Sequence, residues 1–209
     1  MIKARDITLS YGKRNVIEGA SFDIERGDAA VFVGDNGSGK STLLSAIAGS
    51  LKLKSGSIEI GARIGYVPQG SGLIEELSFA DNLRFFASLE GKKVPDTLPL
   101  GADYLRKTKI KNMSGGMKKL CSIVCAVITE PEILILDEPC ASLDRDHKEL
   151  LCEYLCKLKD EGTTILYVGH NSDEYERFAT KYICVTGTVN VYTAEEYRAI
   201  SSKDPEVSV

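Results

Sequence analysis

The chain has 209 residues, of which 43% are hydrophobic and 27% are charged, a composition typical of a globular protein built around one well-packed core. Its formal net charge of −4 argues against a surface that binds nucleic acid, because that affinity comes largely from neutralising phosphates. Lysine and arginine residues are scattered along the chain, and the basic pair Lys118–Lys119 is interpreted as a solvated helix face.

We expect a cytoplasmic protein with reduced cysteines. The N-terminus enters a strand pattern at once and has no apolar core of a signal peptide. The longest apolar runs stop well short of the roughly 18 residues that a membrane-spanning helix needs. The six cysteines lack the tight C-x2-C spacing of a zinc site, so we interpret them as small buried apolar side chains.

The predicted elements alternate between strands and helices along most of the chain. Strands with alternating polarity are predicted at 2–11, 20–26 and 56–61. Strands that are apolar on both faces are predicted at 29–34, 63–67, 133–139, 163–170 and 182–187, and helices at 40–49, 115–129, 146–160 and 172–179. Strands buried on both faces belong in a sheet that helices cover, so the pattern predicts an α/β fold with a mostly parallel sheet and an N-terminal antiparallel β-subdomain.

One stretch breaks this rhythm and predicts a small helical insertion. The segment LSFADNLRFFASLEG (77–91) has helical spacing, and a segment rich in proline and glycine follows it. We predict a single domain over 1–200 and a disordered tail over 201–209. Its core is expected at about 1–70 and 118–200, with a helical subdomain at about 71–117.

The first chemical motif is VFVGDNGSGKST (31–42), an apolar strand followed by a glycine-rich loop and a helix. This is the context of a P-loop, in which successive N–H groups point at phosphate oxygens, and it leaves little room for a chance glycine turn. Lys40 can reach the β- and γ-phosphates, and the Ser41 hydroxyl is placed to ligate Mg²⁺. The predicted nucleotide-binding residues of the loop are Gly34, Asp35, Asn36, Gly37, Ser38, Gly39, Lys40, Ser41 and Thr42.

The second motif, ILILDEP (133–139), supplies the carboxylates that a P-loop enzyme needs. Four apolar residues predict a buried strand that brings Asp137 beside the P-loop to hold Mg²⁺. Glu138 would then be placed to polarise a water for in-line attack. The alternative, an exposed turn, is disfavoured by the apolar run that precedes the two acids.

With these motifs in this order, the chain resembles the nucleotide-binding subunits of ATP-binding cassette (ABC) transporters over roughly residues 1–190. The further matching residues are Tyr11, Gln69 in YVPQG, LSFADNL (77–83), MSGGM (113–117), CASLD (140–144) and His170. The resemblance implies that Tyr11 stacks on adenine, that Gln69 senses Mg²⁺ and the attacking water, and that His170 contacts the γ-phosphate. Taken singly, Tyr11 could be a packing residue, Gln69 a solvated loop residue and His170 a core histidine.

The resemblance therefore implies ATP and Mg²⁺ as cofactors and a defined set of site residues. The catalytic residues it implies are Lys40, Gln69, Glu138 and His170, and the Mg²⁺ ligands are Ser41, Gln69 and Asp137.

It also implies that two cassettes, identical or different, pair head to tail. ATP would lie between the P-loop of one and the signature of the other, and MSGGM (113–117) stands where the family has this signature. Ser114, Gly115 and Gly116 would contact the γ-phosphate of the neighbour's ATP. Asp144, which ends the loop CASLD (140–144), is a further residue expected to bind the nucleotide. Met117 stands where the family usually has glutamine, so we expect a weakened but active composite site.

The expected function is ATP hydrolysis that powers substrate translocation by a separate membrane permease. The chain would then be attached to the cytoplasmic face of the membrane through that permease. Two alternatives remain: a soluble ABC ATPase in protein or cofactor assembly, for example of iron–sulfur groups, and a catalytically inactive scaffold. The intact Lys40, Asp137, Glu138 and His170 argue against the scaffold, and export is preferred to import.

Overall fold

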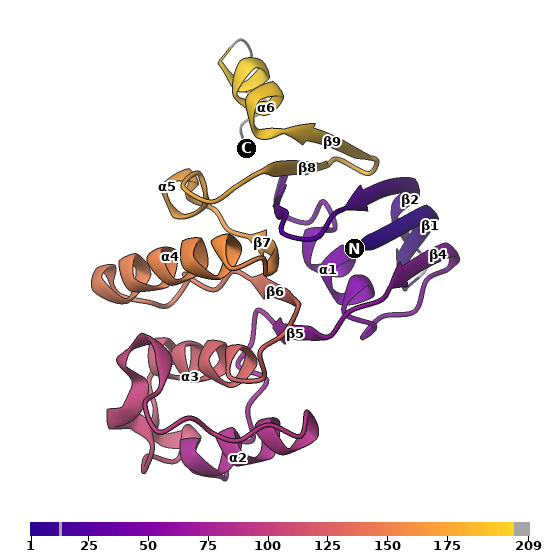
Figure 1. Ribbon diagram of the computed structural model, residues 1–209. Helices are drawn as coiled ribbons and strands as arrows, with labels where there is room; N and C mark the ends of the chain where they lie inside the picture. Colours follow the sequence, from indigo (N-terminus) through magenta and orange to yellow (C-terminus); the bar gives the residue numbers. More distant parts are fainter. Residues whose placement is uncertain (13, 203–209) are drawn as a thin grey trace.

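Two β-sheets with helices between and beside them make up the fold (Figure 1). The computed structural model describes residues 1–12 and 14–202. A three-stranded antiparallel sheet has the order β2–β1–β4, with β1 at Ile2–Tyr11, β2 at Arg14–Ile24 and β4 at Ser55–Ile60. The predicted N-terminal antiparallel sheet is therefore confirmed.

The larger sheet has six strands in the order β5–β6–β7–β3–β8–β9. These are β5 Ile64–Val67, β6 Ile133–Asp137, β7 Thr164–Val168, β3 Ala29–Val33, β8 Lys181–Val185 and β9 Val189–Thr193. All neighbouring strands are parallel except β8 and β9. Because β3, β6 and β7 are parallel neighbours, their carboxyl ends meet at one edge of the sheet, where ligands bind in open α/β folds.

Helices cover both faces of this sheet. The α-helices are α1 Lys40–Ile47, α2 Phe79–Leu89, α3 Gly115–Val127, α4 Arg145–Asp160, α5 Ser172–Tyr175 and α6 Ala194–Ser201. Two 3₁₀ helices, η1 Pro99–Leu105 and η2 Ile110–Asn112, join α2 to α3. The segment from α2 to η2 is the predicted helical insertion, and it lies at the end of the molecule away from the antiparallel sheet (Figure 1).

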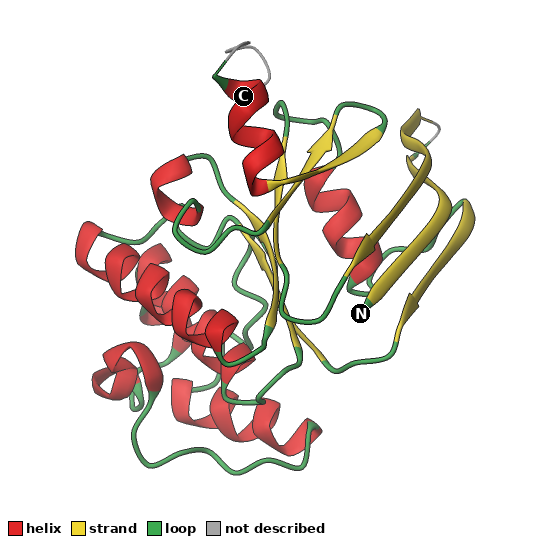
Figure 2. Cartoon of the chain, turned by 45° about the horizontal axis from the view of Figure 1, so that its top comes forward, coloured by secondary structure: helices red, strands yellow, loops and turns green. Residues whose placement is uncertain are grey.

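The core has two parts, one on each face of the six-stranded sheet. Ala30 and Phe32 of β3 face α1 and the antiparallel sheet, so α1 lies between the two sheets (Figure 2). Val31 and Val33 face the opposite layer, which contains α3 and α4. This burial on both faces is what the unbroken apolar strands predicted. Among the described residues, no helix is long and apolar enough to cross a membrane.

Several elements differ from the prediction. β2 begins at Arg14, earlier than expected, and α5 ends at Tyr175, four residues before its predicted end. β9 and α6 were not predicted. The last residue of α6, Ser201, falls in the segment expected to be a disordered tail, and residues 203–209 lie outside the described residues.

Candidate nucleotide-binding site

The P-loop connects β3 to α1 at the carboxyl edge of the six-stranded sheet. Gly39 precedes α1 with φ of 108°, a left-handed conformation that favours glycine. No side chain caps the N-terminus of α1, and its first turn has no acidic residue. The N–H groups of this turn therefore keep donors for an anion such as a phosphate, which the helix dipole also favours.

Lys40 is folded back onto its own loop. Its Nζ donates to the carbonyl oxygen of Gly34 at 2.6 Å and to that of Asp35 at 2.8 Å. The residue is 8% exposed, and burial lowers the pKa of its ammonium, against the attraction of Glu138, Asp35 and Asp137. An incoming phosphate would replace the two carbonyls and stabilise the ammonium charge.

Ser41 and Asp137 form the site predicted for a metal ion. The Ser41 Oγ donates to Asp137 Oδ1 at 3.0 Å, which joins the start of α1 to the end of β6. Asp137 is 2% exposed, and burial raises the pKa of its carboxyl. A hydroxyl and a carboxylate at this distance are hard oxygen donors, and they fit a Mg²⁺ ion that keeps some of its waters.

Glu138 lies between two of the other predicted residues. Its Oε2 accepts from Gln69 Nε2 at 3.3 Å, and its Oε1 is 3.1 Å from His170 Nε2. The Glu138 backbone has φ of 49°, which is uncommon for a residue with a side chain and is found at functional sites. The ends of β5, β6 and β7 thus bring three residues that are far apart in sequence to one point.

These residues surround a cavity of about 640 Å³. Its lining consists of Arg14, Val16, Asn36, Gly37, Gly39, Lys40, Ser41, Thr42, Gln69, Glu138 and His170. An adjoining cavity of about 250 Å³ includes Gly34 and Asp35. The hydroxyl of Ser38 is buried and has no hydrogen-bond partner among the described residues.

Two lining residues were missed in the sequence. Arg14 and Val16 lie on β2, whose first residues were not predicted as a strand. Tyr11 ends β1, but its side chain lies outside what the structure describes. Arg14 pairs with Tyr11 across the hairpin. Tyr11 is expected to stack on adenine, so the closeness of Arg14 to it was the signal in the sequence that could have identified Arg14.

The signature residues lie around a different cavity. Ser114 caps α3 by accepting from Met117 N at 3.2 Å, and Gly115 is the first residue of the helix. A Cβ at Gly116 would come within 2.4 Å of the Ser142 carbonyl oxygen, so only glycine fits there. This cavity has a volume of about 180 Å³, and its lining is Tyr104, Ser114, Gly116, Met117, Leu120, Ser142, Leu143, Asp144 and His147.

Asp144 has a structural role within the chain. Its carboxylate caps α4 by accepting from His147 N at 2.9 Å and also contacts the His147 ring. It lines the signature cavity with Ser114 and not the P-loop cavity with Lys40. The two predicted phosphate cradles are therefore separate within one chain.

The interpretation of Lys118–Lys119 as a solvated helix face is wrong for Lys119. Lys118 reaches Glu75 on the surface at 2.7 Å, as expected. Lys119 is only 5% exposed, because its side chain turns under the loop that follows β5. Of the six cysteines, all are free and only Cys156 is partly exposed, which confirms their interpretation as buried thiols.

Comparison with known proteins agrees with these motifs. The linearmycin resistance ATP-binding protein LnrL of Bacillus subtilis is 33% identical over 196 residues, covering 84% of this chain and 63% of that protein. Nod factor export ATP-binding protein I of Rhizobium meliloti is 32% identical over 204 residues, covering 88% of this chain and 61% of that protein. The chain thus spans about three fifths of the length of these two relatives.

A solved structure described as the ATP binding subunit of an ABC transporter matches all of this chain, and all of its own length, with a TM-score of 0.88 and 26% identity. A family model described as ABC transporter matches residues 17–141. Because this match covers more than half of the sequence and includes both the P-loop and the acidic end of β6, the chain belongs to the ABC transporter family.

Proposed function

We propose that this chain hydrolyses ATP and powers the transport of a substrate through a separate membrane permease. The observation that carries the proposal is the placement of Glu138 between Gln69 and His170 beside the P-loop cavity. Members of this family are ATPases, and the relatives above are named as ATP-binding proteins of resistance and export systems.

The residues divide the chemistry of hydrolysis between them. Lys40 and the N–H groups of the first turn of α1 neutralise the phosphates. Mg²⁺, held by Ser41 and Asp137 with Gln69 nearby, would supply charge neutralisation of the transferred phosphate. Glu138 orients and polarises the attacking water, while the His170 and Gln69 side chains fix the direction of its carboxylate.

A head-to-tail dimer explains why one chain has two phosphate cradles. The uncapped start of α1 binds the phosphates of the chain's own ATP. The start of α3, with Ser114 and Gly116 at a separate cavity, would bind the ATP of a second cassette. ATP would then hold the dimer together, and hydrolysis would release it, so the γ-phosphate controls a two-state equilibrium.

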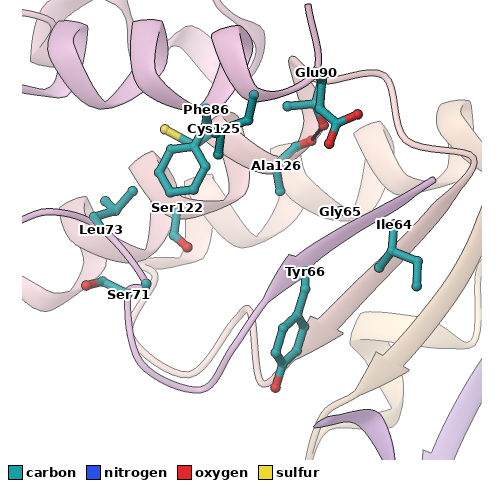
Figure 3. A pocket seen from close by; sticks show the side chains of 13 residues that line it. Ile64, Gly65, Tyr66, Ser71, Leu73, Phe86, Glu90, Ser122, Cys125 and Ala126 are labelled. Carbon is teal, nitrogen blue, oxygen red and sulfur yellow. Dashed lines mark hydrogen bonds between the residues drawn. The ribbon is translucent and has the colours of Figure 1, made fainter. Parts of the chain in front are cut away.

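A groove beside the helical insertion is the proposed contact with the permease. It has a volume of about 180 Å³ between β5, α2 and α3. Figure 3 shows Phe86 of α2 beside Cys125 and above Ser122 of α3, with Leu73 of the loop after β5 at one end and Glu90 at the other. An amphipathic cytoplasmic helix of the permease fits such an apolar groove with a polar end.

The apolar surface continues from Leu89, a lining residue of the groove that is 63% exposed, to Phe85, which lies outside the groove and is 42% exposed. A permease contact would cover both side chains. It would also place this chain at the cytoplasmic face of the membrane. We further propose that residues 71–117 act as a helical subdomain within a single domain over 1–200. Export is the proposed direction, in line with the name of Nod factor export ATP-binding protein I.

The proposal is tested by comparing the wild-type chain with Glu138→Gln. The wild type should hydrolyse ATP with Mg²⁺, and the variant should bind ATP with wild-type affinity but turn it over at least about 100-fold more slowly. Unchanged turnover in the variant would contradict the role of Glu138.

The partner is tested with the same variant. Tagged Glu138→Gln protein and ATP should recover a multispanning protein from solubilised membranes of the source cell. Matched controls are ADP in place of ATP and a Leu89→Asp variant of the groove rim. Recovery of a complex of soluble proteins alone would contradict transport and favour a role in assembly.

A further inference from the structure

Lys119 is a buried cation whose side chain has no carboxylate as a direct ion-pair partner among the described residues. It lies on α3, five residues after the Ser114 cap. Burial lowers the pKa of its ammonium, although Asp137 and Glu138 attract the charge. Burying an ammonium costs free energy unless its hydrogen-bond partners compensate for the lost water.

Those contacts are carbonyl oxygens from two other elements. Lys119 Nζ donates to the carbonyl oxygens of Pro68 and Gln69, each at 2.8 Å, and approaches that of Asp137 at 3.4 Å. Pro68 and Gln69 directly follow β5, and Asp137 is the last residue of β6. One ammonium thus joins α3 to the ends of two neighbouring strands.

The joined residues are those whose positions matter for hydrolysis. The side chain of Gln69 contacts Glu138 at 3.3 Å, and the side chain of Asp137 accepts from Ser41 at 3.0 Å. Lys119 donates to the backbone carbonyls of both Gln69 and Asp137, and within the described residues it has no hydrogen bond or ion pair with either side chain. It can therefore set where the amide and the metal-binding carboxylate lie without itself meeting the nucleotide.

The position of Lys119 on α3 adds a second consequence. The N-terminus of α3 is the signature, which under the proposed function binds the neighbour's ATP. The loop whose carbonyls accept from Lys119 continues into Ser71 and Leu73, which line the groove beside α2. A rigid shift of α3 would therefore move the carbonyls of Pro68 and Gln69 with it.

We propose that Lys119 is a positioning residue that couples the signature helix of one composite ATP site to Gln69 and Asp137 of the other. The inference rests on the proposed function, because it concerns how that hydrolytic site is assembled. Displacing a catalytic group by about 1 Å can cost roughly 100-fold in rate. The effect of losing Lys119 should thus fall on kcat and on cooperativity between sites, and not on the binding of ATP.

The test compares Lys119→Met with the wild type, Lys119→Arg and the control Lys118→Met. Lys119→Met keeps the length of the side chain and removes the charge, so kcat should fall by roughly 10- to 100-fold. The KM for ATP and the affinity for a fluorescent ATP analogue should stay within about threefold, and the Hill coefficient for ATP should fall towards one.

Two further variants separate positioning from a general structural role. Lys119→Arg retains donors for the carbonyls and should recover most of the lost kcat. Lys118→Met, at the partly exposed neighbouring position, should behave as the wild type. Should Lys119→Met not fold, Lys119→Gln replaces it: its amide keeps a donor for one carbonyl, which favours folding, and kcat should still fall because the other carbonyl loses its donor.

The outcomes distinguish this inference from the proposed function. A wild-type chain without ATP turnover would overturn the proposed function and this inference with it. An active wild type with an unchanged kcat in the folded, neutral Lys119 variant would overturn this inference alone. This inference would also be overturned if a rise in KM or a loss of analogue binding accounted for the whole loss of activity in the variant.

Discussion

At the scale of single residues, the site gathers charged groups in a place that water reaches poorly. Asp137 and Lys40 are both nearly buried, and burial raises the pKa of the carboxyl and lowers the pKa of the ammonium. Each charged form is thus less favourable than in water until a ligand compensates it. Such perturbed groups beside a cavity are typical of functional sites.

Asp137→Asn should stabilise the nucleotide-free chain and abolish hydrolysis. Because the pKa of Asp137 is raised in the folded state, ionising it weakens folding at pH 7, and this cost disappears as the pH falls through that pKa. The asparagine removes the cost, so the melting temperature at pH 7 should rise by roughly 2–4 °C for about 1 kcal/mol.

The gain from Asp137→Asn should shrink as the pH is lowered, which calorimetry at several pH values can measure. Ser41→Ala serves as a control, because it removes the hydroxyl that donates to Asp137 but keeps the carboxyl. A variant less stable than the wild type at pH 7 would contradict this account of the buried charge.

Met117→Gln addresses the departure of this chain from the usual signature. Met117 lines the signature cavity beside Ser114, and a glutamine amide there could donate to the neighbour's nucleotide. Each of the two composite sites gains one hydrogen bond of about 1 kcal/mol, so ATP-dependent dimerisation should tighten roughly 30-fold. Sedimentation of the Glu138→Gln background with and without the second substitution measures this, and equal dimer affinities would show that the methionine is neutral.

The residues that sequence predicted best are those in ordered motifs. Lys40, Ser41, Asp137 and Glu138 lie within short stretches whose local structure fixes their direction, so their meeting at one edge could be anticipated. The burial of Lys119 could not be predicted, because a lysine on an amphipathic helix is normally interpreted as exposed to solvent. Its burial depends on a loop that begins about fifty residues earlier in the chain.

At the scale of elements, the loop before α2 is held by one buried side chain. Asn82 is fully buried, and its Oδ1 accepts from Ile74 N at 2.9 Å. Its Nδ2 donates to the carbonyl oxygens of Ile74 at 3.1 Å and Ser78 at 3.0 Å. Asn82 thus fixes the path of the chain between the groove residue Leu73 and the start of α2.

Asn82→Ala should therefore destabilise the chain by about 2–3 kcal/mol, because it removes the three hydrogen bonds of a buried side chain and leaves Ile74 N without its acceptor. Denaturant unfolding measures this free energy. Ser88→Ala, on the exposed side of the same helix, should change stability by less than about 0.5 kcal/mol. A loss below about 1 kcal/mol for Asn82→Ala would contradict the role of this side chain.

The predictability of elements follows from the strength of their local signals. β3, β6 and β7 are apolar on both faces. They were predicted as strands because a short, uninterrupted apolar run is typical of a buried strand. β9 has the same length but is largely exposed, so its pattern was weak.

α6 begins with a capping box between Thr193 and Glu196, a signal that was present in the sequence and missed. Its Tyr197 ring stacks on Tyr182 of β8 with centroids 4.0 Å apart. This contact between separate elements could not be read from the sequence.

At the scale of the whole molecule, the fold keeps two phosphate cradles apart. One begins α1, at the carboxyl edge of the parallel strands, and the other begins α3, beside η1 and the start of α4. The fold class could be predicted because the alternation of elements repeats along the chain. The separation of the cradles followed only from the resemblance to the family, since the order of elements does not show how α3 crosses the sheet.

The central claim is that each ATP is bound by the P-loop of one chain and the signature of another. Mixing Lys40→Ala protein with Ser114→Arg protein tests it, since neither variant alone should hydrolyse ATP. In mixed dimers, one of the two sites would combine an intact P-loop with an intact signature.

The account predicts that the mixture recovers up to about a quarter of wild-type turnover, because about half of the dimers are mixed and each has one intact site. Differently tagged variants allow the mixed dimers to be isolated and confirmed. Isolated mixed dimers with no more turnover than either variant alone would contradict the account.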